Sequence, residues 1–484
     1  MIDVFSPRLR PAHAWWATGP LLLLAACAPL PAARDAAPLA SQATAYPQDA
    51  PRAADGQTAT GLRWSDWIAD PALQDLQQRA LRHSPDVRLA ALRVQEARAT
   101  YGIQRAEGWP TVGASAQGSR SRVPGDLNLS GQPVTTGSYQ VGVGINAWEI
   151  DLWDRLGSLR DAALHHYLAS DATRHAITNR LLAEVAQAYL ALREYDERLA
   201  LAEKTIASRQ ASLRIFTRRV EVGATSRLDL LQVQTLLAQA QALGEQLRQG
   251  RAVQAHALAT LVGETVVLPP APQELHALAL RPVAAGLPSE LLSTRPDLIA
   301  AEQQLRAARA NVQAARAAFF PRITLTTSFG TASAQLDGLW GDGSRAWTFA
   351  PSLSVPLFDA GRLRANLALA DVRSDLAVAS YEQAIQAAFR EVADGLSAQH
   401  HLQQQLQIQQ NALLGQQERE RLARLRYDHG STNFLEVLDA QRELLSAEQQ
   451  LVQTRRALLS ARVGLFAALG GGTDALPAAP EPRP

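Results

Sequence analysis

The sequence predicts an α+β membrane protein in which long coiled-coil helices carry a few short β-strands. Two long stretches repeat apolar residues every seven positions, which is typical of coiled coils. Four short segments alternate between apolar and small polar residues, which is typical of strands. These elements follow one another in the same order twice along the 484 residues, so we expect two internal structural repeats.

The composition excludes several classes of protein. The 47 basic and 46 acidic side chains nearly balance, so the formal charge is +1 and no nucleic-acid partner is expected. Cys27 is the only cysteine, which excludes an intrachain disulfide and a cysteine-rich metal site. The sequence has no Walker loop, GxSxG motif or HExxH motif, so we predict no catalytic residue, no metal and no cofactor.

Residues 1–26 have the pattern of a bacterial lipoprotein signal peptide. Basic residues precede a short apolar run that ends in LAAC at 24–27, and this end resembles a lipobox. We expect cleavage before Cys27 and acylation of its thiol, which would anchor the chain to a membrane. Ala28 in place of aspartate favours the outer membrane, and residues 27–62 form a lipid-anchored tether. The alternative is a chance cysteine within a cleaved signal.

The mature chain contains one unit twice, at 63–270 and 271–472, followed by a flexible tail at 473–484. Pro85 and Pro296 each begin a helical pattern, and they lie 211 residues apart. Each of these helical patterns is followed by two strand-like segments and then by a long helical stretch that is broken once. We therefore expect the two halves to fold alike.

Two strands are expected in each half, at about 111–150 and about 322–357. The alternation is clearest in three segments, at 139–147, 323–329 and 347–355. It is weakest at 111–123. Apolar side chains on one face and small polar ones on the other are typical of a membrane β-barrel, but a half-buried sheet on a soluble core gives the same pattern.

Long helical hairpins are expected at 155–262 and 360–469, with a shorter helix at 296–320. Each hairpin is broken at a glycine, Gly223 or Gly430, and the two glycines lie 207 residues apart. The first helix of the first hairpin would be on the order of 100 Å long. Four strands cannot close a barrel and an open sheet is not viable in lipid, so we expect several copies to complete one barrel.

Several segments resemble the TolC-like outer-membrane efflux family, and within it the NodT/OprM-type lipoproteins. The resemblance covers about 64–470 and is carried by AWEIDLWDRL, LPSELL, RPD, AAFFP, YxxG and LEVLDAQR, at 147–156, 287–292, 295–297, 317–321, 427–430 and 435–442. It implies a homotrimer with a 12-stranded outer-membrane β-barrel, four strands per chain. A long periplasmic α-helical coiled-coil barrel would continue that β-barrel.

The resemblance also implies a function, which is the exit duct of a tripartite efflux system in the cell outer membrane. Drugs or other small toxic compounds would cross the duct passively. The partners would be a periplasmic adaptor (membrane fusion) protein and an inner-membrane transporter of the resistance-nodulation-division (RND) type. One alternative is the exit duct of a type I protein secretion system, and another is a periplasmic coiled-coil scaffold without a pore.

The candidate functional residues lie at the two helix breaks. Glu436 and Asp439 are three residues apart at a helix start, so they share a face, and threefold symmetry would form carboxylate rings around a tunnel. Arg442 can pair with Asp439 within or between chains and hold this periplasmic gate closed, and the resemblance places aperture residues in the same motif. Asp229, 207 residues before Glu436, is a weaker candidate. The alternative is that the carboxylates only complement the helix dipole.

The turns themselves are expected to dock the hairpins of the adaptor. The residues concerned are Gly223, Ala224, Thr225 and Ser226 in the first half and Gly430, Ser431, Thr432 and Asn433 in the second. Ordinary turn chemistry also accounts for glycine followed by serine or asparagine, because glycine ends one helix and the polar residue caps the next.

Overall fold

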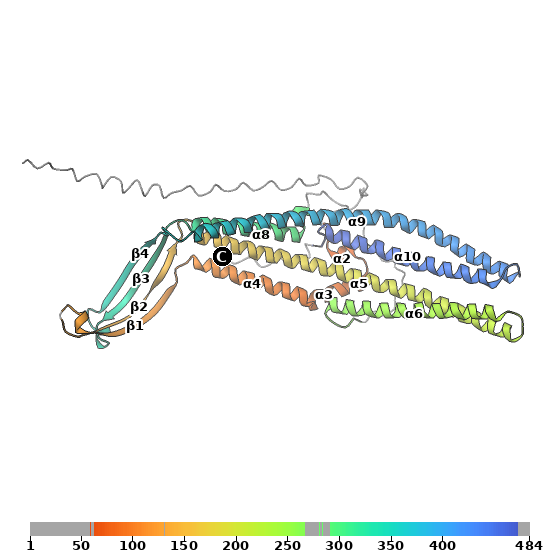
Figure 1. Ribbon diagram of the computed structural model, residues 1–484, viewed down its shortest axis with the longest axis horizontal. Coiled ribbons are helices and arrows are strands. Elements are labelled where there is room, and N and C mark those ends of the chain that lie inside the picture. Colours follow the sequence, from red (N-terminus) through yellow and green to blue (C-terminus); the bar gives the residue numbers. More distant parts are fainter. Residues whose placement is uncertain are drawn as a thin grey trace, which may run out of the picture. The chain divides into compact units, whose positions relative to one another are not determined.

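The computed structural model describes residues 59, 62–129, 131–266, 280, 283 and 291–472, which belong to one compact unit spanning 43–484. The predicted signal peptide, Cys27, nearly all of the tether and the tail at 473–484 lie outside the described residues. Helices and strands alternate in the order α2 to α4, β1, β2, α5 to α8, β3, β4, α9 and α10 (Figure 1).

The bounds of these elements fall close to the predicted ones. The helices are α2 (Trp64–Trp67), α3 (Pro71–His83), α4 (Pro85–Glu107), α5 (Arg155–Glu221), α6 (Arg227–Val262), α7 (Leu291–Thr294), α8 (Pro296–Ala317), α9 (Arg362–Asp428) and α10 (Phe434–Ala468). The strands are β1 (Val112–Val123), β2 (Val134–Ile150), β3 (Arg322–Ser333) and β4 (Arg345–Ser354), with the one-turn helices η2 (Gly125–Leu127) and η5 (Asp337–Trp340).

Two ends differ from the prediction. Helix α8 was expected to reach residue 320, but it ends at Ala317, because Phe319 and Phe320 donate to carbonyls three residues back and so tighten the chain before Pro321. Strand β4 ends at Ser354 rather than near 357. Pro356, which has no backbone N–H, cannot continue the ladder.

The long helices form two hairpins. Helices α5 and α9 contain 67 residues each, which corresponds to about 100 Å at 1.5 Å per residue. Helix α6 folds back along α5 and α10 along α9, and both turns lie at the end of the helices opposite the sheet (Figure 1). Helix α8 packs against both α5 and α9, and α10 also packs against α5, so the two hairpins share a core. The seven-residue repeat of apolar positions expected in the long helical stretches is present in α10, where Leu445, Val452 and Leu459 are buried.

The centre of that core contains large aromatic side chains from distant parts of the chain. The ring of Trp67 stacks on Phe466 with centroids 4.2 Å apart, and Trp64 meets Phe466 edge-on at 4.9 Å. The indole N–H of Trp64 donates to Asn179 on α5 at 2.8 Å, so its polar atom is satisfied while the ring is buried. These contacts join α2, α5 and α10. Within the described residues, no helix has an apolar stretch long enough to cross a bilayer.

The four strands form one antiparallel sheet in the order β1-β2-β3-β4. Strand β1, which had the weakest sequence pattern, pairs with β2 at every position from Val112 to Val123. The ladder is staggered. At the helix end β2 continues five residues past the pair Val112–Ile145, to Ile150, and at the loop end it extends past β3 by the residues before Tyr139. A stagger of this kind is the shear that a barrel wall requires.

One residue of the predicted alternation in β2 is wrong. The pattern 139–147 was expected to continue through Ala147, but a β-bulge lies between Ile145 and Trp148 and shifts the register. Ala147 occupies the bulge with a φ of 49°, a left-handed conformation that alanine rarely adopts. After the bulge Trp148 pairs with Leu325, so its side chain lies on the same face of the sheet as that of Ile145.

The register assigns every strand residue to one of two faces, because directly paired residues lie on the same side of a sheet. The apolar face includes Val112, Ala114, Ala116, Val141, Val143, Ile145, Ile323, Leu325, Phe329, Trp347, Phe349 and Leu353. The small-residue face includes Ser115, Ser119, Ser138, Gly142, Gly144, Thr324, Thr326, Ser328, Gly330, Thr348 and Ser352.

Neither face is covered by any of the described helices. Beyond one another and η5, the strands make no extensive contact with the described elements. Trp347 is 74% exposed and Phe349 is 62% exposed, which are high values for large apolar side chains. Among the described residues, the sheet is therefore not half-buried on a core.

Candidate functional site

The first turn, between α5 and α6, closes by standard helix-end chemistry. Gly223 has a φ of 72°, which glycine adopts without strain, and the N–H of Ala224 donates to the carbonyl of Arg219 at 2.7 Å. Ser226 is the N-cap of α6 and forms a capping box with Asp229. The helix break predicted at Gly223 is therefore confirmed.

The carboxylate of Asp229 is occupied by its own turn. It accepts hydrogen bonds from the hydroxyls of Ser226 at 2.7 Å and Thr225 at 2.9 Å, and from the backbone N–H of Ser226 at 3.3 Å. These donors, led by the Ser226 hydroxyl, lower the pKa of Asp229 below its ordinary value. At this position the carboxylate completes a cap.

The second turn, between α9 and α10, has the same backbone with different side-chain partners. Gly430 has a φ of 73°, and the N–H of Ser431 donates to the carbonyl of Arg426 at 2.9 Å. Asn433 caps α10 by accepting from the N–H of Glu436 at 3.3 Å. The Glu436 carboxylate accepts from Arg426 at 2.7 Å and from the hydroxyl of Thr432, so it ties the end of α9 to the start of α10.

Asp439 is held by two arginines. Arg442, one turn further along α10, donates to it at 2.6 Å, so the predicted pairing is present within the chain. Arg419, on α9, donates to the other oxygen at 2.8 Å. Arg442 also pairs with Glu443 at 3.1 Å. Arg419 was not predicted from the sequence, because its distance from Asp439 along the chain shows no helical spacing.

A separate joint connects the two hairpins close to the turns. The ring of Phe434 on α10 lies 4.5 Å from Phe216 on α5 and 4.9 Å from Tyr427 on α9, measured between centroids. The Arg219 guanidinium lies over Phe216 and Tyr427, at 5.8 Å and 5.7 Å, and donates to the Tyr427 hydroxyl. We call this cation–π and aromatic cluster the hairpin joint, and it was not predicted from the sequence.

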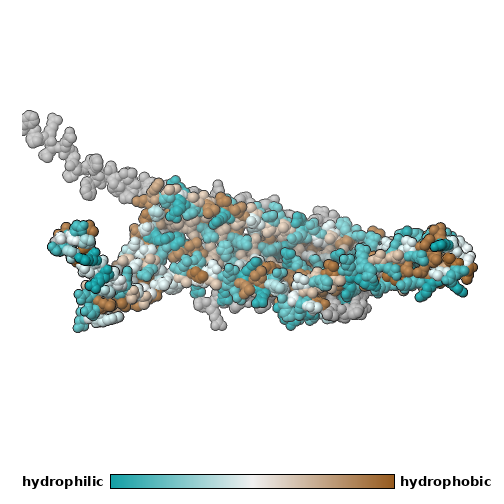
Figure 2. Space-filling view, turned by 60° about the horizontal axis from the view of Figure 1, so that its bottom comes forward, coloured by the Kyte–Doolittle hydropathy of each residue, from teal (hydrophilic) through white to brown (hydrophobic). Residues whose placement is uncertain are grey.

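Apolar side chains are exposed around both turns. Val222 is 62% exposed and Leu228 65% exposed at the first turn, and Leu435 is 49% exposed at the second. Figure 2 shows brown, hydrophobic patches gathered at this end of the helices. Gly223, Ala224 and Ser226 in the first turn, and Gly430, Ser431 and Asn433 in the second, are exposed, whereas Thr225 and Thr432 are half-buried. A partner that docks on the turns would cover apolar as well as polar surface.

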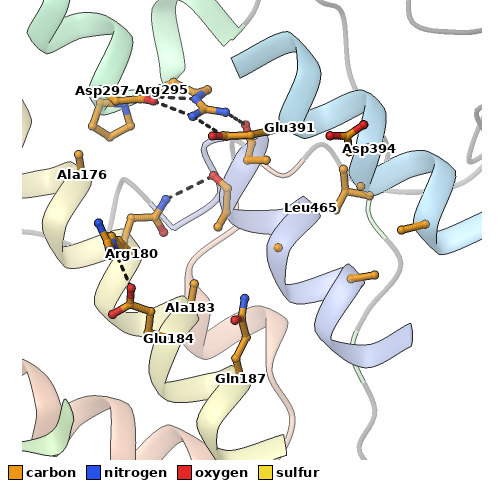
Figure 3. A pocket seen from close by; sticks show the side chains of 18 residues that line it. Ala176, Arg180, Ala183, Glu184, Gln187, Arg295, Asp297, Glu391, Asp394 and Leu465 are labelled. Atoms are coloured by element: carbon orange, nitrogen blue, oxygen red, sulfur yellow. Dashed lines mark hydrogen bonds and ion pairs between the residues drawn. The ribbon is translucent and has the colours of Figure 1, made fainter. Parts of the chain in front are cut away.

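A second polar cluster lies far from the turns, in a groove of about 800 Å³ where α5, α8, α9 and α10 meet (Figure 3). Arg295 precedes α8 and donates to Asp297 at 2.6 Å, to Glu391 at 2.8 Å and to the carbonyl of Ala468 at 3.0 Å. Burial alone would lower the pKa of Arg295, but the two carboxylates outweigh it and raise the pKa. Arg295 thus fixes the start of α8 to α9 and α10, which is a structural role.

Long helical hairpins that end in a four-stranded sheet are also found in solved outer-membrane channels. The structure of the open state of the MtrE channel of Neisseria gonorrhoeae superimposes with a TM-score of 0.81 and 35% identity, over 89% of this chain and 96% of that one. The outer-membrane channel OprN gives a TM-score of 0.83 at 29% identity, over 91% of this chain and 99% of that one. The fold is therefore that of an outer-membrane channel.

Sequence comparisons narrow this class to a family. The family model described as outer membrane efflux protein matches residues 76–264 and 287–471. The outer membrane protein OprJ of Pseudomonas aeruginosa is 41% identical over 94% of both chains. The solvent efflux pump outer membrane protein SrpC of Pseudomonas putida is 42% identical, over 93% of this chain and 97% of its own. The chain belongs to the outer membrane efflux protein family, and its place is the outer membrane.

Proposed function

We propose that three copies of this chain form the exit duct of a tripartite efflux system, through which drugs or other small toxic compounds leave the cell passively. The observation that carries the proposal is the staggered four-stranded sheet, with two open edges, an exposed apolar face and a small-residue face. Open edges are not viable in lipid, and four strands are too few to close a barrel. Three copies supply twelve strands and remove every edge.

The curvature of the sheet supports a lumen on the small-residue face. A Cβ added at Gly142 would lie 2.9 Å from the carbonyl oxygen of Phe329, and one at Gly144 or Gly330 would collide with the neighbouring strand. All three glycines lie on the small-residue face and within the paired part of the strands. On the apolar face the comparable close approach is that of Gly137 to Ala334, which lies beyond the end of β3. We infer that the paired strands bend toward the small-residue face. The apolar face is then convex and meets lipid, while serine, threonine and glycine line the water-filled interior.

The helices extend the duct into the periplasm as a twelve-helix coiled-coil barrel. Support comes from the equal lengths of α5 and α9 and from the similar order of elements at 63–270 and 271–472, which we interpret as two structural repeats. The periplasmic end is then the end with the two turns, because the sheet lies at the other.

The second turn is the gate in this proposal. Glu436, Asp439 and Arg442 are half-buried or exposed in one chain, so threefold symmetry would bring three copies of each around the axis. Asp229 stays the weaker gate candidate, since its carboxylate already accepts three hydrogen bonds from the first turn. Both turns, with their exposed apolar neighbours, would dock the periplasmic adaptor.

The remaining parts of the assembly follow from the sequence and from the relatives. Acylation of Cys27 would anchor each copy to the outer membrane. The names of SrpC and of the toluene efflux pump outer membrane protein TtgI refer to pumps, and an adaptor and an inner-membrane RND transporter would complete such a pump here. The duct needs no catalytic residue. Efflux relatives favour this function over type I secretion, and a scaffold without a pore would leave the exposed sheet unexplained.

Purified full-length protein tests the duct directly. In detergent it should have the mass of three copies, and in a planar bilayer it should form conducting channels. An intact mass that includes acyl chains, lost in Cys27→Ser, tests the anchor. Protein that stays as single chains, or trimers that never conduct, would contradict the proposal.

The partners require a test in cells. A strain that lacks its own outer-membrane efflux component should regain tolerance to an organic solvent or antibiotic when it receives this chain with an adaptor and an RND transporter. Ser431→Trp should abolish that tolerance and cross-linking to the adaptor, while the matched variant Ser431→Ala keeps the turn small and should retain both. Equal tolerance in the two variants would argue against docking at this turn.

A further inference from the structure

Three arginines lie on the apolar face of the sheet, at the end away from the helices. Arg120 and Arg122 are near the end of β1, and Arg345 is the first residue of β4. Their side chains are exposed. Arg120 and Arg122 lie four and six residues after Ala116 in β1, and Arg345 lies two residues before Trp347 in β4. Residues an even number of positions apart in a strand share a face, so all three lie on the apolar face. We call these three residues the arginine belt.

The belt lies at one height above the helix end of the sheet. Arg120 is eight residues beyond Val112 along β1, and Arg345 is eight residues before Leu353 along β4. Eight to ten strand residues span about 27–34 Å, which corresponds to a height of about 20–26 Å at the usual strand tilt of membrane barrels. That height matches the apolar band of such barrels, so the belt would lie at the outer edge of the lipid.

Aromatic side chains separate the belt from the aliphatic part of the face. Tyr139 covers Gly118, where an added Cβ would lie 2.9 Å from its ring, and Phe329 pairs with Trp347 on the neighbouring strands. Aromatic rings at this level are typical of the boundary between acyl chains and headgroups. The guanidinium groups therefore come just beyond that boundary, where lipid phosphates lie.

The arginines of the belt have no carboxylate partner among the described residues. Arg322 provides a contrast, since it lies at the helix end on the small-residue face and pairs with Glu149 at 3.2 Å. Asp126, Asp337 and Asp342, in the connections next to the belt, form no ion pair with it in the described part of the chain. Three free positive charges on a face that meets lipid call for an anionic partner in the lipid.

We propose that the arginine belt binds the phosphate groups of the phosphorylated glycolipid of the outer leaflet, an inference that rests on the proposed trimeric barrel. Strands β1 and β4 are the sheet edges, so closure places Arg345 of one copy beside Arg120 and Arg122 of the next. The planar guanidinium fork matches the oxygens of a phosphate, and each seam between copies offers three forks. A glycolipid bound there bridges two copies and holds the barrel closed.

The test compares lipids on the unaltered trimer. Trimers in detergent should retain added lipopolysaccharide at least about tenfold more strongly than the same lipid after enzymatic dephosphorylation, because charge-assisted hydrogen bonds are lost. Native mass spectrometry of the trimer measures the retained lipid. Equal retention of both lipids would overturn the inference. Because this experiment uses the wild-type protein, its outcome does not depend on the folding of a variant.

A variant then assigns the binding to the belt. Arg120→Gln, Arg122→Gln and Arg345→Gln together should remove retained lipid and lower the temperature at which the trimer dissociates, while Arg322→Gln leaves both unchanged. Undiminished retention in the triple variant would also overturn the inference. If the wild-type protein conducts as a trimer but discriminates neither lipid, only this inference fails, whereas failure to form conducting trimers removes the proposed function itself.

Discussion

The turn at Gly223 and the turn at Gly430 share a backbone but differ in the partners of their carboxylates. Each has glycine at a positive φ and a serine or asparagine N-cap, and equivalent positions are 207 residues apart. Asp229 accepts from two hydroxyls of its own turn, whereas Glu436 accepts from Arg426 of the preceding helix. The carboxylate of the first turn thus bonds only within that turn, whereas the carboxylate of the second turn bonds to the preceding helix, α9.

The difference continues along the helices. Asp439, Arg442 and Arg419 form a charged cluster in the second hairpin, while the positions 207 residues earlier are Gln232, Thr235 and Ser212. Arg219 and Arg426 are also equivalent by this offset, yet one reaches across to Tyr427 and the other binds Glu436. The two turns thus share a backbone framework, and they differ in where ion pairs join the two helices of the hairpin. In the second hairpin such pairs lie next to the turn, whereas in the first the pairs Arg248–Glu203 and Arg251–Asp196 lie further along α5 and α6.

Breaking the hairpin joint should have the largest effect. Phe434→Ala removes a half-buried ring between Phe216 and Tyr427, which we expect to destabilise the joint by about 2 kcal/mol per chain. Both hairpins could then separate at their turns, so channel conductance in a planar bilayer should increase several-fold. The control is Leu435→Ala, whose side chain is 49% exposed. Unchanged conductance of Phe434→Ala in an intact trimer would show that the joint does not restrain the turns.

Removing the charged cluster should cost less free energy per chain than breaking the hairpin joint. Asp439→Ala combined with Arg442→Ala deletes both ion pairs of Asp439, and exposed pairs contribute about 0.2–1 kcal/mol each. Over three chains this amounts to about 3 kcal/mol, or roughly a hundredfold in a concerted equilibrium between closed and open states. Open probability in single-channel recordings measures it.

The matched control for the charged cluster lies in the first hairpin. Gln232→Ala combined with Thr235→Ala changes the equivalent positions, which carry no charge, and should leave the open probability at the wild-type value. If both double variants behave alike, the two halves are equivalent in gating and the second turn is not the gate.

The smallest effect is expected at the first turn. Ser226→Ala removes the N-cap of α6, which typically costs about 1 kcal/mol locally, so amides in the first turn of α6 should exchange faster with solvent. The lowered pKa of Asp229 means that its cap contributes stability above the unfolded pKa and loses it as pH falls through the folded value. In Ser226→Ala the loss should begin at a higher pH. Hydrogen exchange followed by mass spectrometry measures both, and wild-type exchange at every pH would contradict the assigned cap.

The sequence predicted much of the fold because local chemistry sets it. Pro85 and Pro296 start α4 and α8 where expected, because the proline ring fixes φ at a helical value. Gly223 and Gly430 lie just after the ends of α5 and α9, because glycine adopts a positive φ without strain. The seven-residue columns gave the long helices for a similar reason. The bulge at Ala147 escaped prediction because it depends on the register between β2 and β3.

The candidate site was predicted less completely. Arg442 was found because it lies one helical turn from Asp439, but Arg419 and the hairpin joint depend on how α9 is rotated against α10 and α5. No spacing within one helix encodes that rotation. Whether Glu436, Asp439 and Arg442 face a tunnel axis depends further on contacts between copies, and therefore stays a prediction.

The small-residue face has a consequence for what the outer part of such a duct could discriminate. Hydroxyl and amide groups solvate cations and anions about equally. The ionised side chains that the described strands place on this face are Arg322 and Glu149, which lie at the helix end and pair with each other at 3.2 Å. A wall of this kind sorts permeants by size rather than by sign. Selection of substrates by their chemistry would then depend on the inner-membrane transporter. One such channel could therefore serve several transporters with different substrate specificities.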